Sequence, residues 1–166
     1  MSVTGFLTLK GQKQGDIRGS VTLHGKENSI LVHSFSHEIV SPRDAASGLP
    51  TGKRQHRPVT VLKEVDSSSP LLWRALVSNE VLVAWELRFW QTATGAAGAG
   101  TERQFYTVRL TNATIASIRS FLADNEDQTA ANLPLREEIA FTYQKVEWVW
   151  TDGNVSASDS WQSTVT

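Results

Sequence analysis

The sequence predicts an all-β chain of mainly antiparallel strands with one short helix. Through most of the chain apolar residues alternate with polar ones, as in strands that bury one face. Clusters with glycine, proline, asparagine or aspartate interrupt this alternation at short intervals, which is typical of strands joined by turns. One segment alone, after Asp66, combines helical spacing with a helix-start signal. We therefore expect about nine strands in an antiparallel barrel or sandwich.

The composition fits a single folded domain over residues 1–166 and excludes several functional classes. Of the 166 residues, 40% are hydrophobic and 20% are charged, enough for a sizeable core. The net charge of -1 argues against nucleic acid as a partner. The chain has no cysteine, so disulfides and thiolate chemistry are excluded. No apolar run approaches the roughly 18 residues of a membrane span, and the first residues lack the pattern of a secretory signal peptide.

In the first half of the chain, a long loop interrupts the expected strands. Those strands cover residues 6–10, 17–23, 29–40 and 58–65. The loop over 41–57 has no periodicity, and its four basic residues against Asp44 alone give a charge of +3. Long structureless loops in compact domains are usually functional or mobile. We interpret it either as a solvated loop or as an arm that binds something acidic.

The one helix is expected to begin at Ser69 and Pro70. Ser69 is a suitable N-cap, and Pro70 suits the first helical position, where a missing N–H is harmless. Leu72, Ala75 and Leu76 then form an apolar stripe. The pattern ends near Asn79, and so short a helix must be held by packing.

The second half of the chain predicts strands again. They cover residues 81–91, 104–110, 113–122, 139–150 and 155–161. The segment 113–122 also has helical spacing, but its β-branched residues favour a strand. The glycine-rich run 94–101 indicates a hairpin loop, because no Lys-Ser/Thr of a phosphate loop follows. In 139–150 the apolar residues of the alternating pattern change from odd to even positions near Gln144. This change indicates a bulge or a change of buried face.

No constellation of residues indicates catalysis or metal binding. His33 and His37 are four positions apart in one expected strand, next to Phe35 and Ile39. We therefore interpret the two histidines as partly buried or interfacial side chains. A zinc site would need further ligands. The Ser67–Ser69 run lacks a nucleophile elbow. We therefore predict no enzyme activity, no cofactor and no metal.

Three segments go beyond generic β-sheet patterning. They are TGKRQHRP (51–58), KEVDSSSPLL (63–72) and IAFTYQKVEWVW (139–150), the last running on through DGN (152–154) to DSW (159–161). Together these segments resemble the haemolysin-coregulated protein (Hcp) family of bacterial type VI secretion systems. The resemblance covers the whole chain in order, and the turn at 11–16 and the loops at 94–101 and 124–134 are its variable parts.

The resemblance implies a compact β-barrel with one flanking helix and a long extended loop. It further implies hexameric rings that stack into the inner tube of a contractile injection apparatus and hold effectors in the lumen. The implied partners are other copies of the chain, the spike protein, the sheath and effector proteins. The protein would be made in the bacterial cytoplasm and secreted without a cleaved signal peptide. The chain ends five residues after Trp161, so we expect no appended effector domain.

The resemblance also suggests roles for charged and polar segments. In the extended loop we expect subunit or ring contacts at Arg43, Lys53, Arg54, His56 and Arg57. The complementary acidic surface would comprise Asp124, Glu126, Asp127, Glu137 and Glu138, in a segment (124–138) of charge -4. The lumen face would hold Ser34, Ser36 and Glu38, although these could equally face the outside of the ring. The helix-start motif comprises Lys63, Asp66, Ser69 and Pro70. The alternative function is a monomeric β-barrel module that binds a small ligand.

Overall fold

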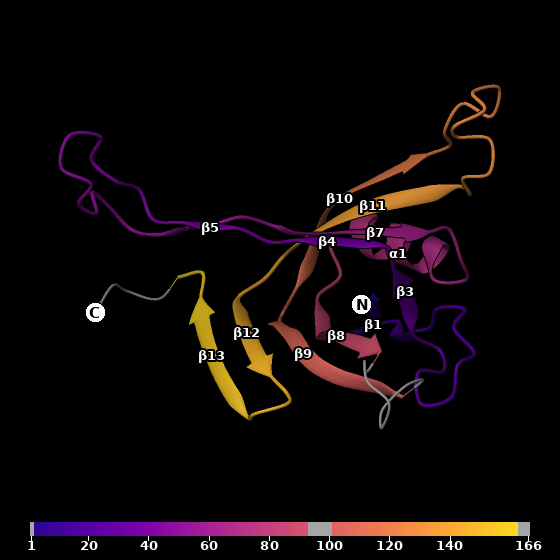
Figure 1. Cartoon of the computed structure of the whole chain (residues 1–166), viewed down its shortest axis with the longest axis horizontal. Helices are drawn as coiled ribbons and strands as arrows, with labels where there is room; N and C mark the ends of the chain where they lie inside the picture. Colours follow the sequence, from indigo (N-terminus) through magenta and orange to yellow (C-terminus); the bar gives the residue numbers. More distant parts are fainter. Residues whose placement is uncertain (1, 93–100, 163–166) are drawn as a thin grey trace.

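The structure is a computed structural model that describes residues 2–92 and 101–162. Its strands form two antiparallel sheets and a small two-stranded ribbon that stands away from them (Figure 1). The larger sheet has the order β13-β12-β9-β8-β1-β2, and β3 also pairs with β1. Its strands are β1 (Val3–Gly11), β2 (Gly15–Ile17), β3 (Ile30–Val32), β8 (Leu82–Thr92), β9 (Glu102–Thr111), β12 (Lys145–Trp150) and β13 (Val155–Ser160).

The smaller sheet has four strands in the order β10-β11-β7-β4. They are β4 (Ser34–Ser36), β7 (Val59–Glu64), β10 (Thr114–Phe121) and β11 (Arg136–Thr142). The ribbon consists of β5 (Ile39–Val40) and β6 (Gln55–His56).

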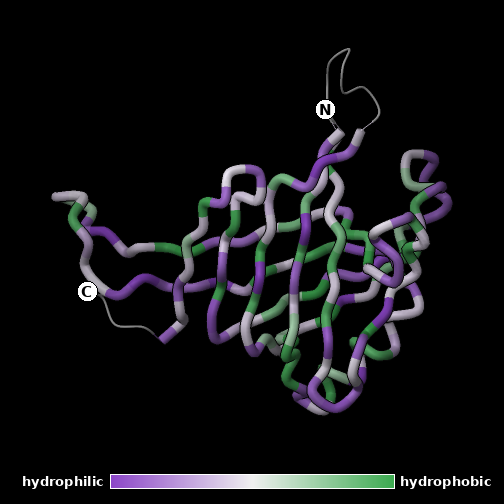
Figure 2. Tube along the Cα trace, turned by 90° about the horizontal axis from the view of Figure 1, so that it is seen from below, coloured by the Kyte–Doolittle hydropathy of each residue, from purple (hydrophilic) through white to green (hydrophobic). Residues whose placement is uncertain are grey.

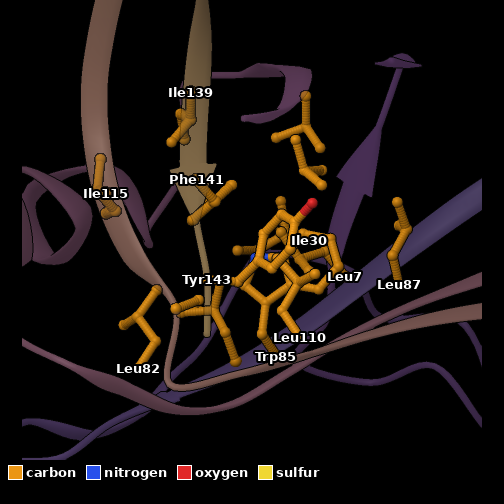
Figure 3. Packing of buried hydrophobic residues seen from close by; sticks show 14 of the residues in the cluster. Leu7, Ile30, Leu82, Trp85, Leu87, Leu110, Ile115, Ile139, Phe141 and Tyr143 are labelled. Carbon is orange, nitrogen blue, oxygen red and sulfur yellow. The ribbon is translucent and has the colours of Figure 1, made fainter. Parts of the chain in front are cut away.

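The core lies between the two sheets (Figure 3). Leu7 and Leu87 of the larger sheet and Ile139 of the smaller sheet are fully buried. Trp85 meets Phe141 across this interface, edge to face, with ring centroids 5.4 Å apart. Figure 2 shows hydrophobic and hydrophilic segments alternating along the strands, and most strands of the two sheets present one side to the core.

The chain crosses from one sheet to the other at two points. At each of them the apolar residues change from odd to even positions of the sequence, or the reverse. The first point is His33, between β3, which pairs with β1, and β4, which pairs with β7. The His33 N–H already donates to the Leu62 carbonyl of β7 at 2.7 Å. After β11 the chain passes through Tyr143 and Gln144 into β12 of the other sheet. The parity switch predicted near Gln144 therefore marks a change of sheet, and 139–150 is two strands, not one.

The helix α1 (Ser69–Val77) links β7 to β8 and packs against β10. It buries Leu72 and Ala75, as the stripe predicted. The N-cap is Ser68, which makes no side-chain capping bond, so the start lies one residue earlier than expected. Ser69 is instead drawn into a buried network, described below. In the described part of the chain no helix is long and apolar enough to cross a membrane.

The all-β class, the antiparallel pairing, the single short helix and the long extended loop are confirmed. Neither sheet closes on itself within residues 2–92 and 101–162, so these strands form a two-layer packing of open sheets. The strand expected over 17–23 is wrong beyond Ile17, because residues 18–29 form turns joined by bonds such as Gly19 N–H to Asn28 carbonyl, 2.9 Å. The strand expected over 29–40 is three short strands. Residues 113–122 form a strand, whereas most of the run 94–101 lies outside the described residues.

Candidate assembly surfaces

The long loop forms a narrow projection, which we call the arm (residues 39–56). Its outer part stands clear of both sheets in two perpendicular views (Figures 1 and 2), whereas its base contacts β13. Its two legs are paired by β5 and β6 and by a bridge between Arg43 and Pro50. At the tip the Asp44 N–H donates to the Leu49 carbonyl at 2.8 Å. The expected loop is thus a hydrogen-bonded structure that can present side chains at a distance from the body.

The basic residues of the extended loop have different environments. Arg43, Lys53 and Arg57 are exposed. Arg54 is tied to Asp159 of the same chain through its Nη2, 2.6 Å from Oδ1, and through its Nε. His56 is only 6% exposed, and its Nε2 lies 2.8 Å from Asp159 Oδ2. Arg54 and His56, expected as intersubunit contacts, therefore make intrachain bonds at the base of the arm.

The base of the arm also contains residues that the sequence did not single out as a site. Tyr143 contacts His56 and His37 through its hydroxyl, and Trp161 stacks on the His56 ring at 5.5 Å. These residues lie far apart along the chain, so no local pattern connects them. The signal that could find them is the DSW at 159–161, which belongs to the segments that carry the family resemblance.

The acidic residues are divided between a loop, a sheet face and the core. Asp124, Glu126 and Asp127 are exposed in the connection between β10 and β11, which we call the acidic tip (residues 122–135). The Thr129 hydroxyl and backbone N–H bind the Asp127 carboxylate and lower its pKa. In Figure 1 the acidic tip and the arm leave the body on opposite sides.

Glu137 is not part of any acidic surface. It is fully buried and forms an ion pair with Lys63, which is also fully buried. The expectation of a surface role is therefore wrong for this residue, because an acidic pattern does not reveal an interior cation from another strand. Glu138, next to it, points to the opposite side and is exposed.

The residues expected in the lumen belong to a sheet face that no other described layer covers. Ser34 and Ser36 of β4 are exposed and pair with Leu62 and Thr60. The same side continues through Glu138 to Arg119 of β10 by successive pairings. Glu38 is exposed and follows β4. The four-stranded sheet thus buries one face in the core and leaves the other largely polar.

The helix-start motif forms a buried polar cluster. The Ser69 hydroxyl donates to Glu137 Oε1 at 2.6 Å and accepts from the Asp66 N–H at 3.0 Å. Lys63 Nζ lies 3.1 Å from Ser69 Oγ and 3.1 Å from Asp66 Oδ1. Pro70 takes an early helical position. The motif therefore joins β7, β11 and the start of α1 inside the molecule.

The histidines do not converge on a metal. His33 lies 3.2 Å from the exposed Glu64 carboxylate, whereas the half-buried His37 bonds to Tyr143. Over residues 2–92 and 101–162, no three metal-binding side chains gather at one point.

Comparisons with known proteins agree with this arrangement of sheets, arm and helix. The family model described as "Type VI secretion system effector, Hcp" matches residues 6–150. The chain belongs to the Hcp family.

Relatives of this Hcp chain match it over nearly their whole length. It is 35% identical to the "Major exported protein" of Pseudomonas aeruginosa, over 99% of each chain. A crystal structure of an Hcp protein matches with a TM-score of 0.88 at 28% identity, over 98% of this chain and 100% of that one. The Hcp1 protein from the E. coli EAEC 042 pathovar matches with a TM-score of 0.83 at 30% identity, over 96% and 99%.

Family membership confirms that the chain is a type VI secretion tube or effector protein, as the resemblance predicted. Hcp is a structural family of secreted proteins and not a known enzyme family.

Proposed function

We propose that this Hcp chain is the structural subunit of the inner tube of a type VI secretion apparatus. Six copies form a ring, and the rings stack into a tube that is driven into a target cell. The observation that carries the proposal is the pair of oppositely charged projections on opposite sides of the body (Figure 1). A ring needs a heterologous contact, in which two different surfaces of one chain are complementary.

The charges suited to this contact are the exposed ones. The arm contributes Arg43 and Lys53, Arg57 directly follows it, and the acidic tip contributes Asp124, Glu126 and Asp127. Each exposed ion pair stabilises an interface by only ~0–1 kcal/mol. These charges therefore act mainly to steer subunits or rings together and to set their register.

The uncovered polar face of the smaller sheet is suited to the tube lumen. Ser34, Ser36 and Glu138 lie on it, and Glu38 follows the same edge strand. A polar and shallow surface holds varied cargo by many weak contacts and has no shaped pocket that would select one ligand. In this arrangement effector proteins occupy the lumen, while the sheath surrounds the tube and the spike caps its end.

The route of the protein follows from this role. The chain is made in the bacterial cytoplasm and leaves with the tube, without a cleaved signal peptide. A relative at 35% identity is named a major exported protein, which supports export of this chain.

Light scattering coupled to size-exclusion chromatography tests the ring. Six chains of 18.3 kDa give a species of about 110 kDa, and negative-stain images should show rings with a central hole. A single 18.3 kDa species at high concentration would contradict the ring. It would favour a monomeric module that binds a small ligand.

Charge reversal tests which surfaces make the contact. The variant Arg43→Glu/Lys53→Glu/Arg57→Glu should weaken rings or tubes, most strongly at low salt, where screening is least. Arg54 stays unchanged because it pairs with Asp159 within the chain. A matched control, Lys10→Glu/Lys13→Glu/Arg18→Glu, makes the same charge change at other exposed residues.

A reversal on the partner surface completes the test. Glu126→Lys reverses an exposed charge of the acidic tip and should partly restore assembly when it is combined with the arm variant. If the arm variant assembles like the wild type at both low and high salt, the arm is not an electrostatic contact.

A further inference from the structure

The Tyr143 hydroxyl lies between two histidine rings at the base of the arm. It is 2.7 Å from His37 Nε2 and 2.7 Å from His56 Nδ1. His56 Nε2 in turn lies 2.8 Å from Asp159 Oδ2. His37 precedes β5 and His56 ends β6, so the cluster ties both legs of the arm to the body.

The hydrogen bonds of this cluster have a definite direction when both rings are neutral. His56 Nε2 faces a carboxylate and must therefore donate, which leaves His56 Nδ1 as an acceptor. The Tyr143 hydroxyl donates to that nitrogen, and its oxygen accepts from His37 Nε2–H. Burial, followed by the charge of Asp159, raises the pKa of Tyr143, so the hydroxyl keeps its proton.

The cluster can accommodate one additional proton. If the His56 ring is protonated, both of its nitrogens donate, and the hydroxyl of Tyr143 can rotate to donate to a neutral His37. If both rings are protonated, each of them can only donate. The Tyr143 O–H then has no acceptor on either ring, and two cations face each other across one oxygen.

The surroundings of His37 disfavour that second proton. The ring is half-buried and is stacked on Trp148 of β12, 6.2 Å between centroids. Burial lowers the pKa of His37, and the charge of His56 lowers it further. The nearby charged groups are Arg54, which directly precedes β6, and Asp159 of β13, and they pair with each other on the far side of His56.

We propose that His37, Tyr143, His56 and Asp159 form a pH-sensitive latch. It holds the arm to the body near neutral pH and loosens when both histidine rings are protonated. Because the pKa of His37 is lowered in the folded protein, the unfolded or released state binds the proton more readily. The hold is therefore complete above the ordinary value of 6.5 and is lost progressively as the pH falls below it.

A nitroxide label on the arm measures this release directly in the full chain. The sequence has no cysteine, so Gln55→Cys, at an exposed residue of β6 next to His56, gives a single labelling site. Its electron paramagnetic resonance spectrum should show an immobile label at about pH 7.5 and a mainly mobile one at about pH 5.

Two histidine variants identify the titrating group. Glutamine at position 37 keeps an amide donor for Tyr143 but takes up no proton, so His37→Gln should abolish the change of mobility. His33→Gln replaces the neighbouring histidine, which contacts Glu64 and not the latch, and should titrate like the wild type. Tyr143→Phe removes the shared hydroxyl and should give a mobile label at both pH values, with circular dichroism showing that the sheets persist.

Two results would overturn the latch. One is a wild-type label whose mobility does not change between the two pH values. The other is a His37→Gln protein that titrates as the wild type does. Both measurements are repeated in the Arg43→Glu/Lys53→Glu/Arg57→Glu background, because a neighbouring subunit bound to the arm would keep the label immobile whatever the state of the latch.

Discussion

Lys63 and Glu137 lie directly opposite each other on β7 and β11, and their fully buried side chains form an ion pair. The Ser69 hydroxyl at the start of α1 donates to the same carboxylate at 2.6 Å. A buried charge without a partner is very costly, so a shift in strand register that separated these groups would be disfavoured. The pair therefore specifies the pairing of β7 with β11 and the position where the helix begins.

Removing one partner of this pair should destabilise the protein strongly. Lys63→Met leaves the Glu137 carboxylate buried without a cation, which costs about 3–5 kcal/mol. Urea denaturation measures the change in the free energy of unfolding. The double variant Lys63→Met/Glu137→Leu should recover most of the loss, because no buried charge remains.

An exposed ion pair provides the control for this prediction. Glu147→Gln removes a partner of Arg109, whose Nη1 lies 2.8 Å from the carboxylate with its side chain 49% exposed. This change should cost at most about 1 kcal/mol. If Lys63→Met costs no more than Glu147→Gln, the buried pair does not contribute in the way we argue.

Gly19 should not tolerate a side chain. A Cβ at this position would lie 2.3 Å from the Ser29 carbonyl oxygen, so the backbone of the 18–29 segment would have to move. We expect Gly19→Ala to lower the free energy of unfolding by about 1–3 kcal/mol. Gly52→Ala is the matched control, because a Cβ there has no neighbour within 4 Å. Equal stability of the two variants would contradict the close approach at Gly19.

Lys26 should stabilise the fold through its charge as well as its packing. The residue is only 5% exposed, and its Nζ lies 4.4 Å from the Trp90 ring centroid and pairs with Glu102. Lys26→Met keeps the apolar stem but removes the cation, so we expect a loss of about 1–2 kcal/mol in thermal or urea unfolding. Lys10→Met, at an exposed residue, should change the stability by less than about 0.5 kcal/mol.

A bulky label on the uncovered sheet face should distinguish the lumen from the outside of the ring. Ser34→Cys, modified with a large thiol reagent, should block cargo retention while the species of about 110 kDa, six chains of 18.3 kDa, persists. Ser78→Cys, at an exposed residue just after α1, should leave cargo retention unchanged. Loss of the ring on labelling Ser34 would instead place this edge strand in a subunit contact.

Much of the fold could be predicted because its signals are local. Alternation over 58–65 and 139–150 predicted strands where β7, β11 and β12 lie, and the Ser-Pro signal predicted the helix within one residue of its start. The parity switch near Gln144 was visible in the sequence, because a strand that changes sheet must also change the side it buries. Its meaning was not visible, since a bulge gives the same pattern.

The candidate surfaces were predicted less completely. Lys53 and Glu126 are exposed as expected, whereas Arg54, His56 and Glu137 bond within the chain. The charge of a segment is a sum over its residues, and it does not reveal which of them the fold pairs internally. These partners lie 105, 103 and 74 positions away, beyond the reach of any local pattern.

The sequence by itself determined the all-β class, the single helix, the long loop and the resemblance to the Hcp family, because periodicity, turn residues and motifs are properties of neighbouring positions. Only the tertiary structure decided which charges are free on the surface and which are buried in pairs. It also brought His37, His56 and Asp159 to Tyr143. The physical reason is that strand pairing joins segments far apart in the chain, and burial then gives each polar group an environment that its own neighbours in the sequence do not specify.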